Sequence, residues 1–260
     1  MMCDKTVPVD NHKNTSFKKS LLLVVPVYNE EKLIEKNVET LYHFLTKNEI
    51  NFKLIIAVSP SDDNSEEIVG KLRDKFTNLE VIIENIKKGR GFSVRNTWKL
   101  YDFDIYAFID ADLATGVNVI AEAYELMIND AADLVTASRY LEGSVVNRPP
   151  LRRLISIQYN RILRLVFKNN IRDYQCGFKA INKKAKTLIL DKTQINSWAW
   201  DTELLIIAYR LGLRIKEIPI TWNEYKYVHT PLKRLFKDIL IHGWGILKLI
   251  NEVKKLETEF

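Results

Sequence analysis

The stretch YAFIDAD at residues 106–112 begins as an apolar run and ends in two carboxylates spaced two positions apart. An apolar run of this kind is typical of a buried parallel strand. In open α/β sheets, ligands bind beyond the carboxyl ends of the strands. Asp110 and Asp112 would offer hard oxygen atoms there, which suit Mg²⁺ or Mn²⁺ beside a phosphate. The alternative is an ordinary acidic turn after the strand, which is the commoner case for an isolated pair with this spacing.

Apolar runs alternate with helical patterns around this stretch. The expected strands cover residues 21–27, 52–58, 79–83, 134–138 and a segment ending at 110, and the expected helices cover residues 30–45, 65–76 and 92–101. Such alternation predicts βαβ units and a mainly parallel sheet. Right-handed crossovers bring the carboxyl ends of the strands to one edge, so we expect residues 28–30, 59–63 and 110–112 to meet there.

Composition limits the class of protein and of partner. The 260 residues are 47% hydrophobic, which is enough for one substantial core in a single large α/β domain. A formal net charge of +6 indicates an anionic partner. The charge alone does not choose among a nucleic acid, a phosphorylated substrate and an acidic membrane surface. Cys3 and Cys176 are far apart and lack metal-type spacing, so we expect no disulfide framework and no zinc site.

Contact with a membrane is expected to be peripheral. No apolar segment reaches the length of a membrane span, and the polar first residues lack the apolar core of a signal peptide. Every charged residue in the segment 148–172 is Arg or Lys, interleaved with Leu, Ile and Val. This pattern predicts a basic amphipathic helix, starting after Pro149 and Pro150, that suits an anionic headgroup layer. An ordinary surface helix packed on the sheet is the alternative.

Six motifs occur in one order along the chain: VVPVYNEE at 24–31, KGRG at 88–91, DADLAT at 110–115, SR at 138–139, DYQCGFK at 173–179 and WDTE at 200–203. In these motifs the chain resembles family 2 glycosyltransferases of the GT-A fold, and among them dolichyl- and polyprenyl-phosphate glucosyl- and mannosyltransferases. The resemblance extends over about residues 21–238. It implies an α/β fold with a GT-A-type, mainly parallel sheet flanked by helices, and amphipathic surface helices in the C-terminal half.

The chain is expected to divide into three parts. The polar residues 1–19 would be a mobile tail, and by the resemblance residues 20–228 would be the GT-A domain. Within that domain, residues 148–172 would form the acceptor and membrane-surface helix. Residues 229–260 would form a second amphipathic helical segment, for which packing against the domain and contact with a membrane are both open.

A donor site for a nucleotide sugar, UDP-glucose-like or GDP-mannose-like, follows from the same resemblance. Asp110 and Asp112 would hold Mg²⁺ or Mn²⁺. The residues implied to bind the nucleotide sugar are Pro26, Tyr28, Glu30, Ser59, Lys88, Asp110, Ala111, Asp112, Asp201 and Glu203. Ser59 departs from the family pattern, because relatives place an acid there that contacts the base. Its hydroxyl can donate and accept a hydrogen bond but carries no charge.

On the acceptor side, Arg139, Arg152 and Ser156 match positions that hold the lipid phosphate in relatives. Arg152 and Ser156 stand four residues apart, so they share one face of a helix. A guanidinium group suits two-point contact with phosphate oxygens. The residues implied to act in catalysis are Asp112, Asp173 and Arg139.

Six further residues in the C-terminal half each have two open roles. Asp201 and Glu203 either contact sugar hydroxyls or charge the start of a helix through residues 205–209. Trp198 and Trp200 either wall the sugar pocket or fill the core. Lys226 and His229 are expected in a loop before the final helix, where they either close over the diphosphate or form a solvated basic loop.

These expectations combine into an inverting, metal-dependent transfer of a hexose from a nucleotide sugar to a polyprenyl or dolichyl phosphate, by a protein at the cytoplasmic face of a membrane. A phosphate monoester has a second pKa of about 6, so its oxyanion needs no strong general base. One alternative is transfer to a carbohydrate hydroxyl with Asp173 as the base. Another is a nucleotidyltransferase, but its Gly-rich loop after the first strand is absent. A third is a non-enzymatic basic module that binds a membrane or nucleic acid. Because the Arg-rich segment lacks an aromatic cluster, we expect no nucleic acid.

Overall fold

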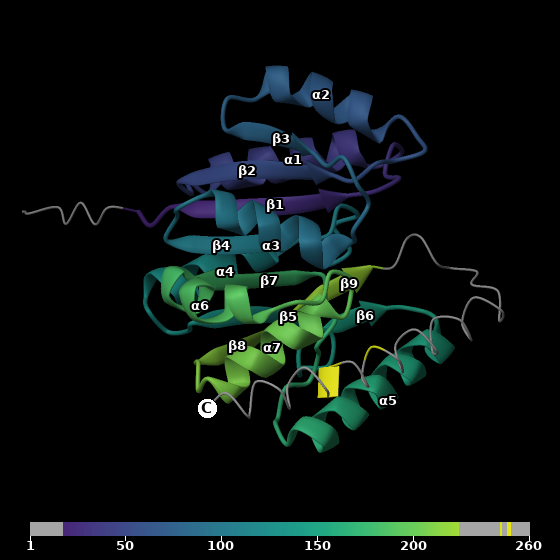
Figure 1. Ribbon diagram of the computed structural model, residues 1–260, viewed down its shortest axis with the longest axis vertical. Helices are drawn as coiled ribbons and strands as arrows, with labels where there is room; N and C mark the ends of the chain where they lie inside the picture. Colours follow the sequence, from purple (N-terminus) through teal and green to yellow (C-terminus); the bar gives the residue numbers. More distant parts are fainter. Residues whose placement is uncertain (1–17, 224–244, 246–248, 251–260) are drawn as a thin grey trace, which may run out of the picture.

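A seven-stranded sheet with the order β3-β2-β1-β4-β7-β5-β8 forms the middle layer of the protein (Figure 1). The computed structural model describes residues 18–223, 245 and 249–250. The strands of this sheet are β1 (Leu21–Val27), β2 (Phe52–Val58), β3 (Leu79–Ile83), β4 (Ile105–Ile109), β5 (Leu134–Ser138), β7 (Phe178–Asn182) and β8 (Ile215–Pro219). A small second sheet pairs β6 (Val145–Asn147) with β9 (Thr221–Asn223) in parallel.

Helices cover both faces of the large sheet. They are α1 (Ile34–Lys47), α2 (Ser65–Lys75), α3 (Arg90–Leu100), α4 (Asn118–Ile128), α5 (Pro150–Phe167), α6 (Lys183–Ile189) and α7 (Trp200–Arg210), with a short 3₁₀ turn at Leu190–Lys192. The alternation of strands and helices confirms the mainly parallel α/β fold that the sequence predicts.

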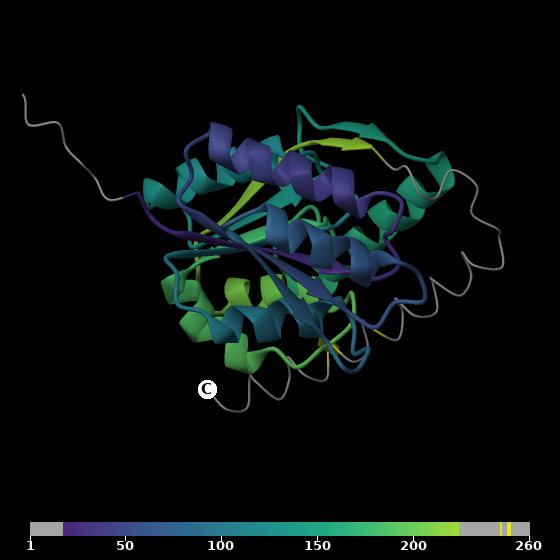
Figure 2. The same ribbon diagram turned by 90° about the horizontal axis from the view of Figure 1, so that it is seen from above.

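The strands decide the two cores, because successive side chains point to opposite faces of a sheet. Leu21, Leu23 and Val25 of β1 pack in a cluster with side chains of α1, α2 and α4. Leu22 and Val24 pack on the other face with side chains of α3, α6 and α7. Figure 2 shows the two helical layers on either side of the sheet. Burial on both faces is why these strands have nearly continuous apolar sequences.

One strand departs from the predicted parallel arrangement. β7 runs antiparallel between β4 and β5, with Ala180 opposite both Ala107 and Val135. Its amino end therefore lies at the edge where its neighbours have their carboxyl ends. Because of this reversal, residues 173–177, which precede β7, arrive at the same edge as Asp110 and Asp112.

The first helix begins later than the sequence predicts. Asn29 has a left-handed backbone with φ of 55°, and the Glu30 N–H donates to the Ser65 hydroxyl at 2.8 Å. These contacts hold the residues after β1 in a turn, so α1 begins at Ile34 and not near residue 30. The turn keeps the segment after β1 in contact with the segment after β2.

The predicted basic helix is present as α5, and it is shorter than the segment 148–172. Pro150 begins it, and Lys168 ends it in a left-handed conformation. Its second half is anchored in the core by Leu163 and Phe167, whereas Leu165 is 78% exposed. In the part of the chain that the structure describes, no helix has the length and apolar character needed to cross a bilayer.

The N-terminal and C-terminal segments lie largely outside the described residues. This applies to nearly all of the predicted tail 1–19, to Lys226 and His229, and to most of the segment 229–260. Gly245, Leu249 and Ile250 are helical exceptions, and Leu249 is fully buried in the cluster that includes residues of α3 and α7. At Leu249 the chain packs against the domain.

Asp133 provides a test of the electrostatics of the fold. Its buried carboxylate accepts hydrogen bonds from Arg214 Nε at 3.1 Å and from Asn182 Nδ2 at 3.0 Å, and these contacts hold its pKa well below the ordinary value. A lowered pKa in the folded state stabilises the protein above the unfolded pKa of about 3.9, and this stabilisation is lost as the pH falls toward the folded value. We expect Asp133→Asn to lower the free energy of unfolding by about 1 to 3 kcal/mol at pH 7 and by less at pH 3.

Urea unfolding at both pH values measures the difference. The matched control is Asp130→Asn, because Asp130 also pairs with Arg214 at 2.8 Å but its side chain is 75% exposed. An exposed pair of this kind contributes at most about 1 kcal/mol. Equal losses in the two variants would contradict the assigned role of Asp133.

Candidate functional site

The turn after β4 carries the two aspartates of the DAD motif. The Asp110 N–H donates to the Gly177 carbonyl at 2.9 Å, so the turn is tied to the residues before β7. Asp112 Oδ1 accepts the Ala114 N–H at 3.2 Å, and Leu113 takes a left-handed φ of 50°. Asn37 of α1 donates from Nδ2 to the carbonyl of Ala111 at 2.8 Å. The backbone between the two aspartates is thus held from both sides.

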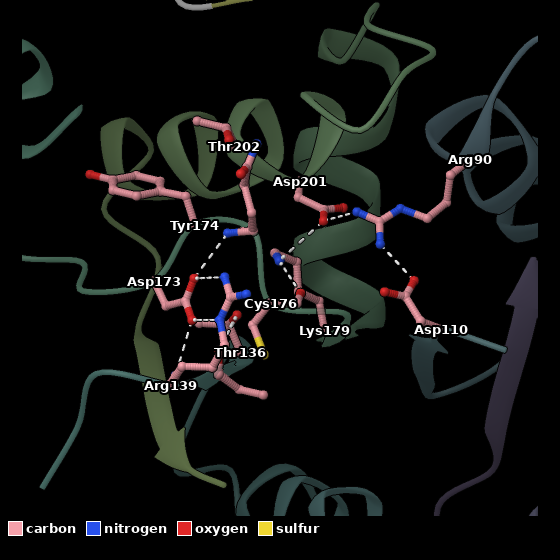
Figure 3. Close-up of polar contacts among 12 residues, drawn as sticks. Arg90, Asp110, Thr136, Arg139, Asp173, Tyr174, Cys176, Lys179, Asp201 and Thr202 are labelled. Atoms are coloured by element: carbon pink, nitrogen blue, oxygen red, sulfur yellow. Dashed lines mark hydrogen bonds and ion pairs between the residues drawn. The ribbon is translucent and has the colours of Figure 1, made fainter. Parts of the chain in front are cut away.

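Arg90, at the start of α3, is the central cation of the site. Its Nη1 donates to Asp110 Oδ1 at 2.6 Å, and its Nη2 donates to Asp201 Oδ2 (Figure 3). Lys179 of β7 lies 3.7 Å from the same Asp201 oxygen and donates to the Cys176 carbonyl at 3.0 Å. Two cations and two carboxylates from β4, α3, β7 and α7 therefore form one cluster whose formal charges balance.

Burial shapes the protonation of this cluster. The side chains of Lys179 and Asp201 are fully buried, and that of Arg90 is 6% exposed. Burial lowers the pKa of Lys179 and raises the pKa of Asp201, although the opposite charges nearby counteract both shifts. Burial also acts against the charge of Arg90, but Asp110 and Asp201 outweigh it and raise the pKa of the guanidinium. Arg90 is therefore a permanent cation.

Two glycines allow the elements of the cluster to meet. A Cβ on Gly177 would lie 2.1 Å from Asp110 Oδ2, and a Cβ on Gly91 would lie 2.3 Å from the Trp200 Cβ. Both distances are far shorter than a van der Waals contact. The glycines of the KGRG motif thus permit close approach of α3 to the start of α7, where the Phe92 N–H donates to the Asn196 carbonyl at 3.1 Å.

Asp173 and Arg139 form a second buried pair. Arg139 donates from Nε at 2.7 Å and from Nη2 at 2.8 Å to the two oxygens of Asp173, and its backbone N–H donates at 3.0 Å (Figure 3). Burial opposes the charge of Asp173, but Arg139 outweighs it and holds the pKa of this carboxyl below its usual range. Among the described residues, Arg139 Nη1 has no hydrogen-bond partner. The pair leaves this one donor for a further anion.

Arg152 and Ser156 lie on the first half of α5 and are half-buried. Asn160 follows Ser156 by four residues on the same side of the helix, and its Oδ1 accepts the Tyr174 N–H at 3.1 Å. The hydroxyl of Tyr159 lies 3.3 Å from that of Thr202 in α7. These contacts fix the second half of α5 beside Tyr174, the residue that follows Asp173.

The residues predicted for the nucleotide gather at the ends of β1, β2 and β3. Tyr28 is 38% exposed, and the Lys87 ammonium lies 3.3 Å from the centre of its ring. Ser59 is buried, and its hydroxyl donates to Glu84 Oε2 at 2.8 Å. Pro26 and Glu30 are half-buried, and Lys88 is exposed on the loop before α3. The residues predicted for the nucleotide therefore lie near one another at the ends of these three strands, and Glu84 lies among them.

The two acids of the WDTE motif have different surroundings. Glu203 accepts the backbone N–H groups of Gln194 at 3.0 Å and Ile195 at 2.9 Å, so it holds the loop before α7. Asp201 faces the Arg90 cluster. The tryptophans also differ, because Trp200 is fully buried against Phe108, whereas Trp198 is 59% exposed with its ring 4.0 Å from the Arg90 guanidinium carbon. Trp200 fills the core, as one of the two predicted roles requires.

A divalent cation fits the chemistry of the DAD turn. Mg²⁺ accepts one or two carboxylates and takes its remaining ligands from phosphate and water. Asp110 Oδ1 is held by Arg90 and Asp112 is half-buried at the edge, so the turn carries carboxylate oxygens of the kind that a divalent cation prefers. Within the described residues, no three His, Cys, Asp or Glu side chains form a metal cage. This donor set fits a cation shared with a phosphorylated ligand.

Four residues of the site were not singled out from the sequence: Arg90, Asn37, Lys179 and Glu84. Arg90 and Lys179 stand inside quoted motifs, and a cation between two glycines could have indicated a buried partner for Asp110. Asn37 stands in an ordinary helix sequence, and Glu84 is an ordinary acid directly after β3. Their roles emerge only when the fold brings them to the edge.

Comparisons with known proteins agree with this geometry. The family model "Glycosyl transferase family 2" matches residues 22–188. Glycosyltransferase AglD of Haloferax volcanii is 34% identical over 230 residues, which cover 87% of this chain and 36% of AglD. Dolichyl-phosphate beta-glucosyltransferase ALG5A of Trichomonas vaginalis is 27% identical over 212 residues, which cover 78% of this chain and 66% of that protein. The human dolichyl-phosphate beta-glucosyltransferase is 28% identical, with 79% of this chain and 68% of the relative covered.

The chain thus spans about a third of the length of AglD and about two thirds of the length of the other two. Among solved structures, glucosyl-3-phosphoglycerate synthase of Mycobacterium tuberculosis with Mn²⁺, UDP-glucose and phosphoglyceric acid has a TM-score of 0.67 at 19% identity, over 90% of this chain and 80% of that one. The same enzyme with Mg²⁺ and UDP has a TM-score of 0.64. This likeness confirms the GT-A fold.

The charge balance of the Arg90 cluster leads to a double-mutant test. Asp201→Asn leaves an uncompensated buried cation, and we expect it to lower the free energy of unfolding by about 3 to 5 kcal/mol. Lys179→Met leaves an uncompensated anion and is also destabilising. Combined, the two changes leave Arg90 and Asp110 as a balanced pair, so the double variant should lose about 1 to 3 kcal/mol less than the sum of the single losses.

Urea unfolding of the four proteins measures this coupling. Lys183→Met is the control, because Lys183 is 57% exposed and pairs with an exposed Asp102. It should change the free energy of unfolding by about 0.5 kcal/mol or less. Strictly additive losses at positions 179 and 201 would contradict a shared charge balance.

Proposed function

This chain belongs to glycosyl transferase family 2. From this premise we propose that it transfers glucose from UDP-glucose to dolichyl phosphate or a similar polyprenyl phosphate. It is a glycosyltransferase. The names of its dolichyl-phosphate relatives support this acceptor and this sugar. The neighbouring structures with UDP and UDP-glucose support the nucleotide.

The single observation that carries the choice of acceptor is the pairing of Asp173 with Arg139. A general base must take up a proton near the working pH. Both oxygens of Asp173 accept hydrogen bonds from Arg139, and the pKa of this carboxyl is lowered, so Asp173 is a weak proton acceptor. Transfer to a carbohydrate hydroxyl would need such a base. Transfer to a phosphate monoester does not, because its oxyanion is already the nucleophile.

The reaction we propose is a direct displacement. An acceptor phosphate oxygen forms a bond to the anomeric carbon of the sugar while the bond from that carbon to the diphosphate oxygen breaks. The electron pair leaves with the nucleoside diphosphate, and the configuration at the carbon is inverted. A bound Mg²⁺ or Mn²⁺ would neutralise charge on the leaving diphosphate, and Asp112 would hold it.

The protein must align two anions that repel one another. Arg139 Nη1 is a donor that Asp173 leaves available, and Arg152 and Ser156 are half-buried on α5, the helix that Asn160 ties to Tyr174. We propose that these three residues bind the acceptor phosphate. Because Asp173 and Asn160 hold this surface in place, little reorganisation is needed during the reaction. The Arg90 cluster holds Asp110 on the donor side in the same way.

The first half of α5 also supports contact with a membrane. Its exposed apolar side chains are Leu151 and Leu154, and Arg153 is exposed between them. Exposed leucines beside arginines suit the boundary between lipid headgroups and acyl chains. We propose that this half of α5 lies at an anionic membrane surface, where the phosphate of a membrane-bound lipid would reach Arg152.

The donor side is tested by Asp112→Asn. We expect this variant to lose transfer of glucose, by about 100-fold or more, because the amide lacks the charge that holds a divalent cation. Purified protein is incubated with Mn²⁺, a short polyprenyl phosphate and either UDP-glucose or GDP-mannose, and the product is scored by mass spectrometry. Asp74→Asn, at an exposed position on α2, is the control and should retain full activity. Transfer by Asp112→Asn at the native rate would refute the assigned role.

The acceptor side is tested by Arg152→Ala. Loss of a charge-assisted contact to phosphate should raise the KM for the lipid phosphate about 10- to 100-fold and leave the KM for UDP-glucose within about twofold. The matched control is Arg153→Ala, one residue further along α5 and exposed on another side. A short acceptor that is soluble in water keeps membrane binding out of the measurement. Equal changes in the two KM values, or equal effects of the two variants, would count against this acceptor site.

A further inference from the structure

The contact between Ser59 and Glu84 brings an acid next to the position after β2, where this chain has a serine and its relatives have an acid. Ser59 directly follows β2, and Glu84 directly follows β3, the neighbouring strand. The Glu84 N–H donates to the Val58 carbonyl at 2.9 Å, so the strand pairing continues to this residue. The Ser59 hydroxyl then donates to Glu84 Oε2 at 2.8 Å. An acid from β3 therefore lies beside the position where a serine replaces the acid after β2.

One oxygen of this carboxylate is left for a ligand. Ser59 occupies Oε2, whereas Oε1 has no hydrogen-bond partner among the described residues. Glu84 is half-buried, so its carboxylate is still accessible. The loop after β3 continues to Lys87, whose ammonium lies over the Tyr28 ring. Glu84 is thus part of the same group of strand ends as the residues we assign to the nucleotide.

We propose that Glu84, oriented by Ser59, is the residue that selects the nucleobase of the donor. The proposal rests on the proposed function, because it requires that a nucleotide sugar binds at the ends of β1, β2 and β3. Glu84 Oε1 would accept a hydrogen bond from a ring N–H of the base. Ser59 is a positioning residue, because it acts by fixing the carboxylate.

The hydrogen-bonding groups of the bases determine which ones fit a carboxylate. Uracil presents one ring N–H, at N3, between two carbonyl groups. Cytosine has a lone pair at N3, and adenine has one at N1, so both place an acceptor against the negative oxygen. Guanine presents a ring N–H beside an amino group, which suits a carboxylate with both oxygens available. Because Ser59 occupies Oε2, the single donor of uracil fits Glu84 best.

The experiment measures the binding of nucleoside diphosphates by the full chain in the presence of Mn²⁺. Isothermal titration calorimetry gives the affinities for UDP, CDP and GDP. We expect the native protein to bind UDP more tightly than CDP. Glu84→Gln should weaken UDP binding about 10- to 100-fold, because a charge-assisted hydrogen bond is lost, and should change CDP binding far less.

A second variant tests the role of Ser59 through an expected gain in GDP affinity relative to UDP affinity. Ser59→Ala frees Oε2 of Glu84, so the carboxylate can receive both donors of guanine. The ratio of GDP affinity to UDP affinity should therefore rise, by about 3- to 10-fold. Glu80→Gln is the matched control, because it makes the same change four residues earlier, within β3, where Glu80 pairs with Lys53 at 2.5 Å and not with Ser59. It should leave all affinity ratios unchanged.

The outcomes separate this inference from the proposed function. If the native protein binds UDP but Glu84→Gln keeps the ratio of UDP to CDP affinity within twofold, Glu84 does not select the base and only this inference falls. If the native protein binds none of the nucleoside diphosphates, the proposed function falls, and the inference falls with it. Thermal denaturation checks that each variant is folded. If Glu84→Gln is unfolded, an unchanged GDP to UDP ratio in Ser59→Ala overturns the inference.

Discussion

The geometry of the site depends on the guanidinium of Arg90, which is buried between Asp110 and Asp201. This one side chain joins the first turn of α3 to the end of β4 and the start of α7. The contact is possible because Gly91 and Gly177 have no Cβ, so the three elements approach more closely than other residues would allow. A buried charge without a partner is costly, so each member of the cluster constrains the others. Asp110 is fixed in this way, and Asp112, two residues further, stands at the edge of the sheet.

The guanidinium groups of Arg90 and Arg139 are both held by carboxylates of the protein. Arg90 donates from its two Nη atoms to Asp110 and Asp201, and Arg139 donates from Nε and Nη2 to Asp173. Their positive charges are therefore largely compensated within the protein, and neither acts as an isolated charge that attracts anions from a distance. The carboxylates instead fix the orientation of each guanidinium group. A guanidinium held at two points needs no reordering when a substrate binds. Longer-range attraction is left to exposed cations such as Lys88.

The sequence predicts the parallel strands well, because β1 and β2 are apolar on both faces and their bounds agree with the predicted ranges. It does not separate Asp201 from Glu203. Residues two apart on a helix point about 200° apart, so one faces the cluster and the other faces the preceding loop. The role of Glu84 is also hidden, because an acid after an edge strand has no distinguishing pattern. It becomes visible only through the β2 to β3 pairing, which brings it to Ser59.

The antiparallel strand β7 explains why residues far apart in the sequence must meet at this site. β7 lies between β4 and β5, so both of its faces are covered and Lys179 is fully buried. A buried ammonium group needs acceptors, and here they are the Cys176 carbonyl and Asp201 at the first turn of α7. The positive end of the α7 dipole further favours the charged form of Asp201. The reversal of one strand thus couples the centre of the sheet to α7 behind the DAD turn. Tyr28, Lys88 and Trp198 stay exposed, so their side chains are accessible to a bound ligand.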